Sequence, residues 1–272
     1  MVKTAFKLAY IGTDFHGFQR QPDLPTVEGE LFRAFKRAGV MDDPGNSNYS
    51  IAGRTDRGVH ALGNVVSLKT DSNATINQIN YYLPPSIQII GKAEVPDGFK
   101  PRFAEHRHYK YVFFNDPYDN KVLNLKKMES VSKILEGTHN FQNFTKRCER
   151  APTRTVKELK VSKGGKFIII DVVGESFLWN MVRKMVMVII MAGRGEMEEN
   201  EIKPLLNPDI SASITPVPPE GLILMDVKYK NVEFSSDKYA KNNFFKTLKE
   251  EYINRKTIAA VEEEMIKVLT AR

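Results

Sequence analysis

The sequence predicts an α+β fold, in which two successive α+β units are followed by a helical C-terminal tail. Residues 3–10 alternate apolar and polar side chains, as a strand with one buried face does. Residues 26–38 have the cap and the apolar spacing of an amphipathic helix. A second series of strands and helices starts near residue 103, although no sequence repeat relates it to the first. The predicted boundaries are 1–102, 103–235 and 236–272.

The first unit is expected to contain four strands and two helices. Thr26 is expected to cap the first helix, and Gly39 to end it, because Val27, Leu31 and Phe35 fall on one face between them. The remaining stretches alternate or carry turn composition at their ends. The predicted strands are 3–10, 48–52, 64–70 and 87–94, and the predicted helices are 26–38 and 74–83.

The second unit is expected to begin with a strand and to end with one. A Lys-Gly-Gly-Lys turn at 163–166 predicts a hairpin between two strands. Residues 177–192 are apolar on nearly every side, which predicts a buried helix. The predicted strands are 109–115, 158–162, 167–173 and 221–229, and the predicted helices are 128–135, 177–192 and 198–206.

The tail is highly charged, with eight Lys/Arg and six Asp/Glu residues between 236 and 272. Mixed charge of this kind is typical of a solvated helix, which is the interpretation we favour. An arm that contacts phosphates is the alternative interpretation.

The composition is that of an ordinary globular protein. Of 272 residues, 42% are apolar and 27% are charged, which excludes wholesale disorder. The net charge of +7 favours a polyanionic partner. Cys148 is the single cysteine, which excludes an internal disulfide framework and a multi-cysteine zinc site and fits a reducing compartment.

Targeting signals are not apparent. The first residues, MVKTAFKLAYIG, carry charges and lack the apolar run of a secretory signal. The most apolar stretch, 177–193, contains Arg183 and Lys184 and is shorter than the roughly 20 residues that span a membrane. We therefore expect a soluble, cytoplasmic protein that does not bind a membrane.

The loop GRTDRGVHA (53–61) brings two arginines, a carboxylate and a histidine together between two predicted strands. Asp56 lies close in sequence to Arg54 and Arg57, and this positive charge favours its ionised form. An ionised aspartate in a basic pocket suits nucleophilic or base chemistry on an anionic substrate. A surface turn with local ion pairs remains an alternative.

This loop resembles the signature of the tRNA pseudouridine synthases of the TruA family, GRTDAGVHA, with Arg57 where alanine is common. Five further segments resemble family motifs in the expected order, so that the resemblance covers about residues 3–230. They are YIGTDFHGFQRQP (10–22), FKPRFAEHRHYKY (99–111), THNFQNFTK (138–146), SFLWNMVRKMV (176–186) and PEGLILMDVKY (219–229).

The resemblance implies an isomerisation of uridine in tRNA, in which the base is detached from C1′, turned and rejoined through C5. Such a reaction needs no cofactor and no metal. The sequence agrees, since it has no GxGxxG after the first strand, no P-loop and no HExxH. The essential carboxylate would be Asp56. Whether it attacks C1′ or C6, or assists a glycal route, stays open.

The resemblance also assigns roles to three further catalytic candidates. Arg54 matches the arginine that helps to extrude the target nucleotide, with a phosphate contact or a loop salt bridge as the alternative. Tyr109 matches the tyrosine that packs against the target base, whereas Tyr111 is expected to be a core aromatic. Arg183 matches the partner of the catalytic aspartate. We therefore predict an Asp56–Arg183 ion pair that joins the two units.

Other residues are candidates for substrate contacts, or have side chains that could act as a base or a nucleophile. Arg107 and Arg57 are candidate tRNA contacts, and so is Arg20, for which a solvated surface role is an equal alternative. His60 is expected to hold the loop rather than to act as a base. Lys146 and Arg147 are candidate contacts to the RNA backbone, with a solvated surface role as an equal alternative, and Cys148 is expected to be an incidental thiol.

By resemblance, each unit would have a ferredoxin-like (RRM-like) topology, and the antiparallel sheets would meet at a central basic cleft. The partner would be tRNA, bound by a homodimer, and the target would lie in the anticodon stem-loop, at positions 38–40. A synthase of the same superfamily that modifies other tRNA positions is one alternative. A non-catalytic RNA-binding protein is another, and the lack of a methyl-donor loop disfavours a C5 methyltransferase.

Overall fold

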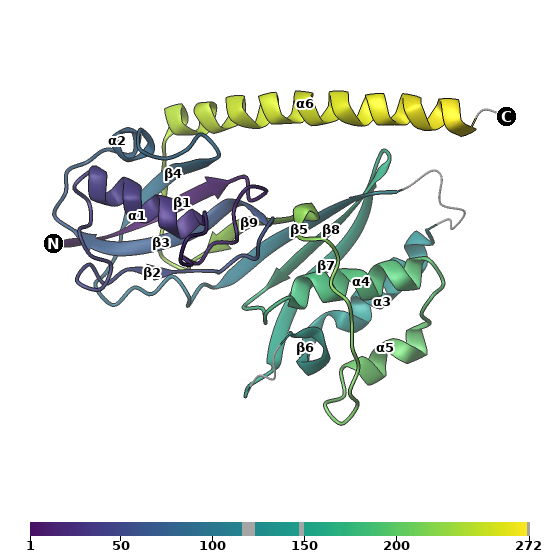
Figure 1. Ribbon diagram of the computed structural model, residues 1–272. Coiled ribbons are helices and arrows are strands. Elements are labelled where there is room, and N and C mark those ends of the chain that lie inside the picture. The colour runs from purple at the N-terminus through teal and green to yellow at the C-terminus, as the bar shows by residue number, and fades with distance from the viewer. Residues whose placement is uncertain (116–122, 147–149, 271–272) are drawn as a thin grey trace.

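The computed structural model describes residues 1–115, 123–146 and 150–270, and one large, mostly antiparallel sheet dominates it (Figure 1). The strands are β1 (Val2–Tyr10), β2 (Ser50–Ile51), β3 (His60–Thr70), β4 (Ile87–Glu94), β5 (His106–Phe114), β6 (Gly137–Asn140), β7 (Thr153–Gly164), β8 (Phe167–Gly174), β9 (Leu222–Lys228) and β10 (Ser235–Ser236). The helices are α1 (Val27–Arg37), α2 (Ile76–Asn80), α3 (Leu125–Leu135), α4 (Met181–Gly193), α5 (Glu199–Leu205) and α6 (Lys238–Thr270), with short 3₁₀ turns at η1 (Gln142–Phe144) and η2 (Pro219–Gly221).

The sheet runs in the order β10-β4-β1-β3-β9-β5-β8-β7-β6, with β2 paired to β3. Its N-terminal half contains β4-β1-β3, with β2 beside β3, and the helices α1 and α2. Its C-terminal half contains β9-β5-β8-β7, with the short strand β6 at the edge, and the helices α3, α4 and α5. The halves meet where β3 pairs with β9 in parallel, through His60 opposite Ile223 and Ala61 opposite Leu224. The α+β class is therefore confirmed, whereas the two sheets expected for the units are joined into one sheet.

The first predicted helix forms as its sequence dictates. The hydroxyl oxygen of Thr26 accepts a hydrogen bond from the Gly29 N–H at 3.2 Å, which satisfies one free donor of the first turn. Val27, Leu31, Ala34 and Phe35 are buried, as their spacing predicts.

Helix α4 begins four residues later than the sequence predicts. Asn180 adopts a left-handed conformation with φ of 65°, so Phe177, Leu178 and Trp179 belong to the preceding loop. Met185 and Val186 are among its completely buried residues, and the expected burial is confirmed. Because a left-handed residue cannot continue a helix, the loop ends at a fixed point, one turn before Arg183.

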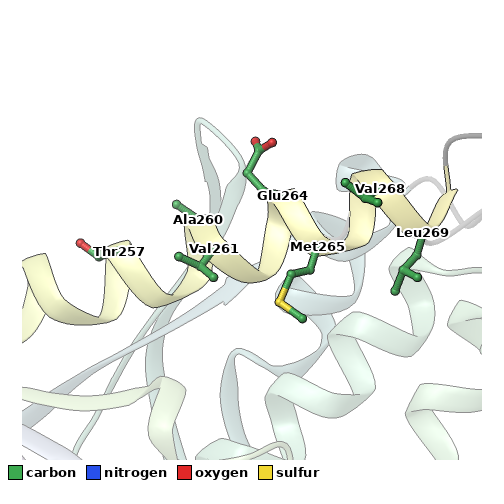
Figure 2. Close-up of a pocket in the computed structure, with 7 residues that line it drawn as sticks. All are labelled: Thr257, Ala260, Val261, Glu264, Met265, Val268 and Leu269. Atoms are coloured by element: carbon green, nitrogen blue, oxygen red, sulfur yellow. The ribbon is translucent and has the colours of Figure 1, made fainter.

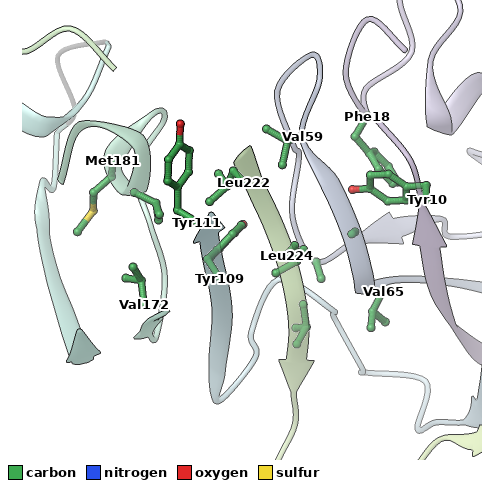
Figure 3. Close-up of a cluster of buried hydrophobic side chains, with 14 of the residues drawn as sticks. Tyr10, Phe18, Val59, Val65, Tyr109, Tyr111, Val172, Met181, Leu222 and Leu224 are labelled. Carbon is green, nitrogen blue, oxygen red and sulfur yellow. The ribbon is translucent and has the colours of Figure 1, made fainter. Parts of the chain in front are cut away.

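The core passes without a break through the junction of the halves. Figure 3 shows Tyr109 and Tyr111 from β5 beside Leu222 and Leu224 from β9, with Tyr10 farther along the same layer. Leu224 lies opposite both Ala61 and Tyr109 in the sheet, so buried side chains join β3 to β5 through β9.

The tail forms the long helix α6, as predicted. Its first turns are not simply solvated, because Phe244 packs with Ala9, Ile11 and Ile90. Alternate residues of β1 face opposite sides of the sheet, and Leu8 and Tyr10 belong to the main core. The beginning of α6 therefore covers the second face of β1.

The end of α6 is largely exposed and carries an apolar stripe that includes Val261, Met265 and Val268 (Figure 2). Polar contacts also link the helix to the body. Arg255 donates to Thr13 Oγ1 at 3.4 Å, and Lys166 Nζ lies 3.8 Å from Glu263. In the part of the chain that the structure describes, no helix is both long and apolar enough to cross a membrane.

Candidate active site

The loop 53–59 reaches the junction of the halves, where the buried polar residues Tyr10 and Asn64 hold it in place. The Tyr10 hydroxyl lies 2.8 Å from Thr55 Oγ1, and Asn64 donates to the Gly53 carbonyl at 2.9 Å and to Tyr10 at 3.1 Å. The Phe18 N–H donates to the Thr55 carbonyl at 3.0 Å. Burial raises the pKa of Tyr10, so this hydroxyl stays neutral and keeps its hydrogen bonds.

Two glycines allow the loop to take this shape. Gly58 has φ of +83°, a conformation that residues with a Cβ rarely adopt. At Gly12, a Cβ would stand 2.0 Å from the Val59 carbonyl oxygen, so only glycine lets the segment after β1 lie against the loop.

Asp56 is held at both carboxylate oxygens by residues of the other half. Arg183 NH1 donates to Oδ2 at 3.1 Å, and the Trp179 indole Nε1–H donates to Oδ1 at 2.9 Å. The side chains are partly buried, with 28% of Asp56 and 14% of Arg183 exposed. The ion pair predicted between Asp56 and Arg183 is therefore present, and it joins the loop before β3 to the beginning of α4.

Arg183 is itself fixed by two further acceptors. Its Nε donates to the Val217 carbonyl at 2.8 Å, and NH1 also donates to Asn180 Oδ1 at 3.1 Å. A guanidinium has five donors in a rigid plane, so contacts in several directions define its orientation. Arg183 thus presents a positive charge to Asp56 from a defined position.

Tyr109 and Tyr111 differ in their surroundings. Tyr111 is 3% exposed and donates to the Pro218 carbonyl at 3.1 Å, so its predicted place in the core is confirmed. Tyr109 is 9% exposed and stacks edge-on against Phe177, with ring centroids 5.4 Å apart. Burial raises the pKa of Tyr109 to about 12, which Arg107 opposes and Asp56 reinforces. Tyr109 therefore lies within the electrostatic reach of Asp56.

Arg54 and Arg57 flank Asp56 and are exposed. Neither guanidinium forms a hydrogen bond or ion pair with another side chain that the structure describes. The alternative of local ion pairs within the loop thus finds no support here for these two arginines. Arg20 lies elsewhere, with its guanidinium 5.4 Å from the ring centroid of Phe32 on α1.

Arg107 has a position that argues against a substrate contact. It is 6% exposed, and its guanidinium donates to three backbone carbonyls, at 2.6 Å to Glu175, 2.9 Å to Ala52 and 2.8 Å to Arg102. A buried guanidinium that is engaged in this way ties loop ends together. Two of these carbonyls, those of Ala52 and Glu175, lie 55 and 68 residues from Arg107 in the sequence, so the sequence that suggested a substrate contact did not reveal them.

His60 holds the loop, in agreement with the role expected for it. The Gly12 N–H donates to its Nδ1 at 3.1 Å, so the ring proton is on Nε2, which lies 3.1 Å from the Glu220 carbonyl oxygen. Burial lowers the pKa of His60, which the Glu220 carbonyl opposes. If Nδ1 were protonated, its N–H would face the Gly12 N–H, and two donors would oppose each other.

We expect His60 to make the stability of the fold depend on pH. Because its folded-state pKa is lowered below the unfolded value of about 6.5, the unfolded state binds the proton more readily. The unfolding free energy should therefore fall as the pH drops below about 6.5. Urea unfolding at several pH values should show a smaller fall for His60→Gln, and equal falls in both proteins would contradict this assignment.

Lys184 is a buried cation on α4 that holds the segment around η1. Its Nζ donates to the carbonyls of Thr145 at 2.7 Å and Asn143 at 3.3 Å, and burial lowers its pKa. The Lys146 N–H, one residue farther along, donates to the Trp179 carbonyl at 3.2 Å. Lys184 thus fixes the segment that supports Trp179.

Methionine has a side chain of similar length to lysine but no ammonium. Replacement of Lys184 by methionine should therefore destabilise the protein by about 1–3 kcal/mol, because the two buried carbonyls lose the donor that they share. Urea unfolding would measure the change. Lys203→Met, on the exposed face of α5, is the control and should stay within about 0.5 kcal/mol of the wild type. A Lys184→Met protein as stable as this control would contradict the assigned role.

Sequence reasoning missed Trp179, although it is the single tryptophan and lies in a quoted motif. Arg147 and Cys148 lie outside the described residues. Among the residues that are described, no group of three or more His, Cys, Asp or Glu side chains could hold a metal ion.

Known proteins with similar sequences define the class to which this chain belongs. A family model described as tRNA pseudouridine synthase matches residues 131–230. Proteins named tRNA pseudouridine synthase A are similar over almost the whole chain. The one from Methanosphaera stadtmanae is 45% identical over 272 residues, which cover 99% of each chain.

Two further relatives give the same result. The protein of that name from Methanobrevibacter smithii is 44% identical and covers 99% of this chain and 98% of its own. The one from Methanothermobacter thermautotrophicus is 44% identical over 97% of this chain and 95% of its own. The chain therefore belongs to the tRNA pseudouridine synthase A family, a family of isomerases.

Proposed function

We propose that the protein isomerises uridine to pseudouridine in tRNA, with Asp56 as the essential carboxylate. The observation that carries the proposal is the position of Asp56 at the junction of the halves, where Arg183 and Trp179 each hold one carboxylate oxygen. Arg183 stabilises the negative charge that the carboxylate needs in order to act at the ribose or the base. The same two donors leave further lone pairs on each oxygen for chemistry.

The reaction rearranges bonds within one nucleotide. The bond between N1 and C1′ breaks and a bond between C5 and C1′ forms. The hydrogen on C5 leaves as a proton, and N1, which has lost its bond to the ribose, takes up a proton, so that the product is an isomer of uridine. Tyr109 would pack against the uracil, because its ring lies within the electrostatic reach of Asp56 and an aromatic face stacks on a base. Arg54 would fill the space that the nucleotide leaves in its stack, and its exposed guanidinium supports that role.

Two features support tRNA as the substrate. The relatives at 44–45% identity are named for action on tRNA. Arg54 and Arg57 present two cations next to Asp56, where phosphates of a bound RNA would pass. We place the target in the anticodon stem-loop, at positions 38–40, and Arg57 would help to select it. Arg20, which lies against Phe32 of α1, remains a candidate contact outside the loop 53–59.

We further infer that each half is a ferredoxin-like unit and that the halves form a basic cleft where they meet. The strand orders β4-β1-β3-β2 and β9-β5-β8-β7 support this, because both read fourth, first, third, second within their unit when the short edge strand β6 is not counted. The division near residues 102 and 103 separates these sets. A cytoplasmic homodimer would complete the enzyme, and analytical ultracentrifugation at assay concentration would test the dimer.

The reaction can be tested with tRNA that carries tritium at C5 of its uridines and with no cofactor added. Release of tritium by the wild-type protein is the expected result, because only the C5 hydrogen leaves. Mapping of the pseudouridine should then find it at 38–40. Formation elsewhere would overturn the proposed target, and binding without release from any tRNA would favour a non-catalytic RNA-binding protein.

We expect the exposed end of α6 to add nothing to tRNA binding. Residues 257–272 contain two Lys/Arg and three Glu, so their net charge is −1. A protein that ends after Lys256 should fold as stably as the full chain, since this segment contributes nothing to the core. Its tRNA affinity should show the same dependence on salt, and a shallower dependence would identify phosphate contacts in the tail.

A further inference from the structure

Trp179 contacts Asp56, but the proposed chemistry gives it no role of its own. The indole Nε1–H donates to Oδ1 at 2.9 Å, while Arg183 donates to Oδ2. A single hydrogen bond restrains a carboxylate loosely, because it tolerates a range of distances and angles. A second donor on the other oxygen narrows the orientations that are allowed, since both hydrogen bonds must then be kept.

Trp179 can act in this way because its own position is fixed from three directions. Its carbonyl accepts the Lys146 N–H at 3.2 Å, and the Lys146 ammonium lies 4.6 Å from the centroid of its ring. The left-handed Asn180 follows it and ends the loop. The indole is thus held on both sides of its Cα and across its ring.

We propose that Trp179 is a positioning residue for the reaction, whose indole N–H fixes the orientation of the Asp56 carboxylate toward the substrate. The inference rests on the proposed function, since it requires that Asp56 act on the nucleotide. Trp179 does not touch the reacting atoms in this account. Its contribution is to keep one oxygen lone pair aimed at the ribose, which matters because misplacement of a catalytic group slows a reaction severely.

The test compares Trp179→Phe with Trp179→His. Phenylalanine keeps a ring for Lys146 but loses the N–H and part of the volume of the indole. The imidazole of histidine superposes on the pyrrole half of an indole, with Nε2 where Nε1 lay, so it can donate to Oδ1 again. Tyr229→Phe is the control, since it also removes one hydrogen bond, to the Pro101 carbonyl at 2.8 Å, away from Asp56.

We expect Trp179→Phe to lower kcat about tenfold while KM and the tRNA dissociation constant stay within about twofold. Trp179→His should recover a substantial part of kcat, and Tyr229→Phe should match the wild type. The free energies of unfolding of all variants would show whether a fall in kcat is accompanied by a loss of stability. A purely packing role predicts that histidine, the smaller ring, is worse than phenylalanine.

Three results would overturn the inference, namely an unchanged kcat in Trp179→Phe, a kcat in Trp179→His below that of Trp179→Phe, and a rise in KM that accounts for the whole loss. The proposed function fails separately, through an active Asp56→Asn protein. If Asp56→Asn is inactive and Trp179→Phe has wild-type kinetics, only the positioning role is wrong.

Discussion

Replacement of Asp56 by asparagine should reduce turnover by at least about a thousandfold while tRNA binding persists. The amide is nearly the same size as the carboxylate, but it has no negative charge with which to form a covalent bond or stabilise a developing positive charge. The tRNA dissociation constant should change little, because phosphate contacts provide most of the affinity. Single-turnover kinetics and filter binding would separate the two effects.

The structure also predicts a small loss of stability in this variant. Arg183 and Trp179 each point a donor at one oxygen of Asp56, and an asparagine has one oxygen to offer. One donor would face the amide NH₂, so we expect a loss of about 1–2 kcal/mol in the free energy of unfolding. Asp97→Asn, which loses a surface ion pair with Lys69, is the matched control and should keep full activity.

Replacement of Arg183 by methionine should have the second largest effect. It removes the cation from Asp56 and also the donors to Asn180 Oδ1 and the Val217 carbonyl. Because the pair is partly exposed, we expect a loss of about 1–3 kcal/mol in stability, below the range of a fully buried pair. The rate constant kcat should fall about a hundredfold, since the carboxylate loses its charge partner and its fixed position.

Two companion variants make this prediction specific. Arg183→Lys keeps the charge but presents a single ammonium, which cannot reach all three acceptors, so kcat should lie between those of the wild type and Arg183→Met. The Asp56→Asn/Arg183→Met double variant should be less destabilised than the sum of the single changes. Additive losses would show that the two side chains do not interact in solution.

The secondary structure was predicted best where local signals decide it. The cap at Thr26 and the Lys-Gly-Gly-Lys turn lie within a few residues of the elements that they define, so α1 and the β7–β8 hairpin agree with expectation. The start of α4 was wrong by four residues, because the apolar pattern continues through Phe177 and Leu178 while the backbone turns at Asn180. β6 and β10 were missed, since pairing with neighbouring strands defines such short segments.

The site was predictable only in part, because its contacts join residues that lie far apart in the sequence. The motifs around Asp56 and Arg183 predicted their ion pair across 127 residues, which no local signal could supply without the family resemblance. Trp179 was missed because its contact with Asp56 depends on the left-handed turn that follows it. The buried position of Arg107 was not predictable, because its acceptors include Ala52 and Glu175, which tertiary packing alone brings to it.

The parallel pairing of β3 with β9 was also beyond the sequence. Two residue pairs make this connection, and the strands lie far apart along the chain. At Gly63, a Cβ would stand 2.6 Å from the Met225 carbonyl oxygen, so the close approach of the two backbones depends on glycine. A lone glycine within a strand pattern indicates such an approach without naming the partner strand.

The central claim is that Asp56, held between Arg183 and Trp179, performs the isomerisation of uridine. It is tested most directly by tritium release from C5-labelled tRNA under single-turnover conditions, with the wild-type protein and Asp56→Asn compared side by side and no cofactor added. We predict release by the wild type and none by Asp56→Asn, although both bind the tRNA. Equal release by the two proteins would contradict the claim.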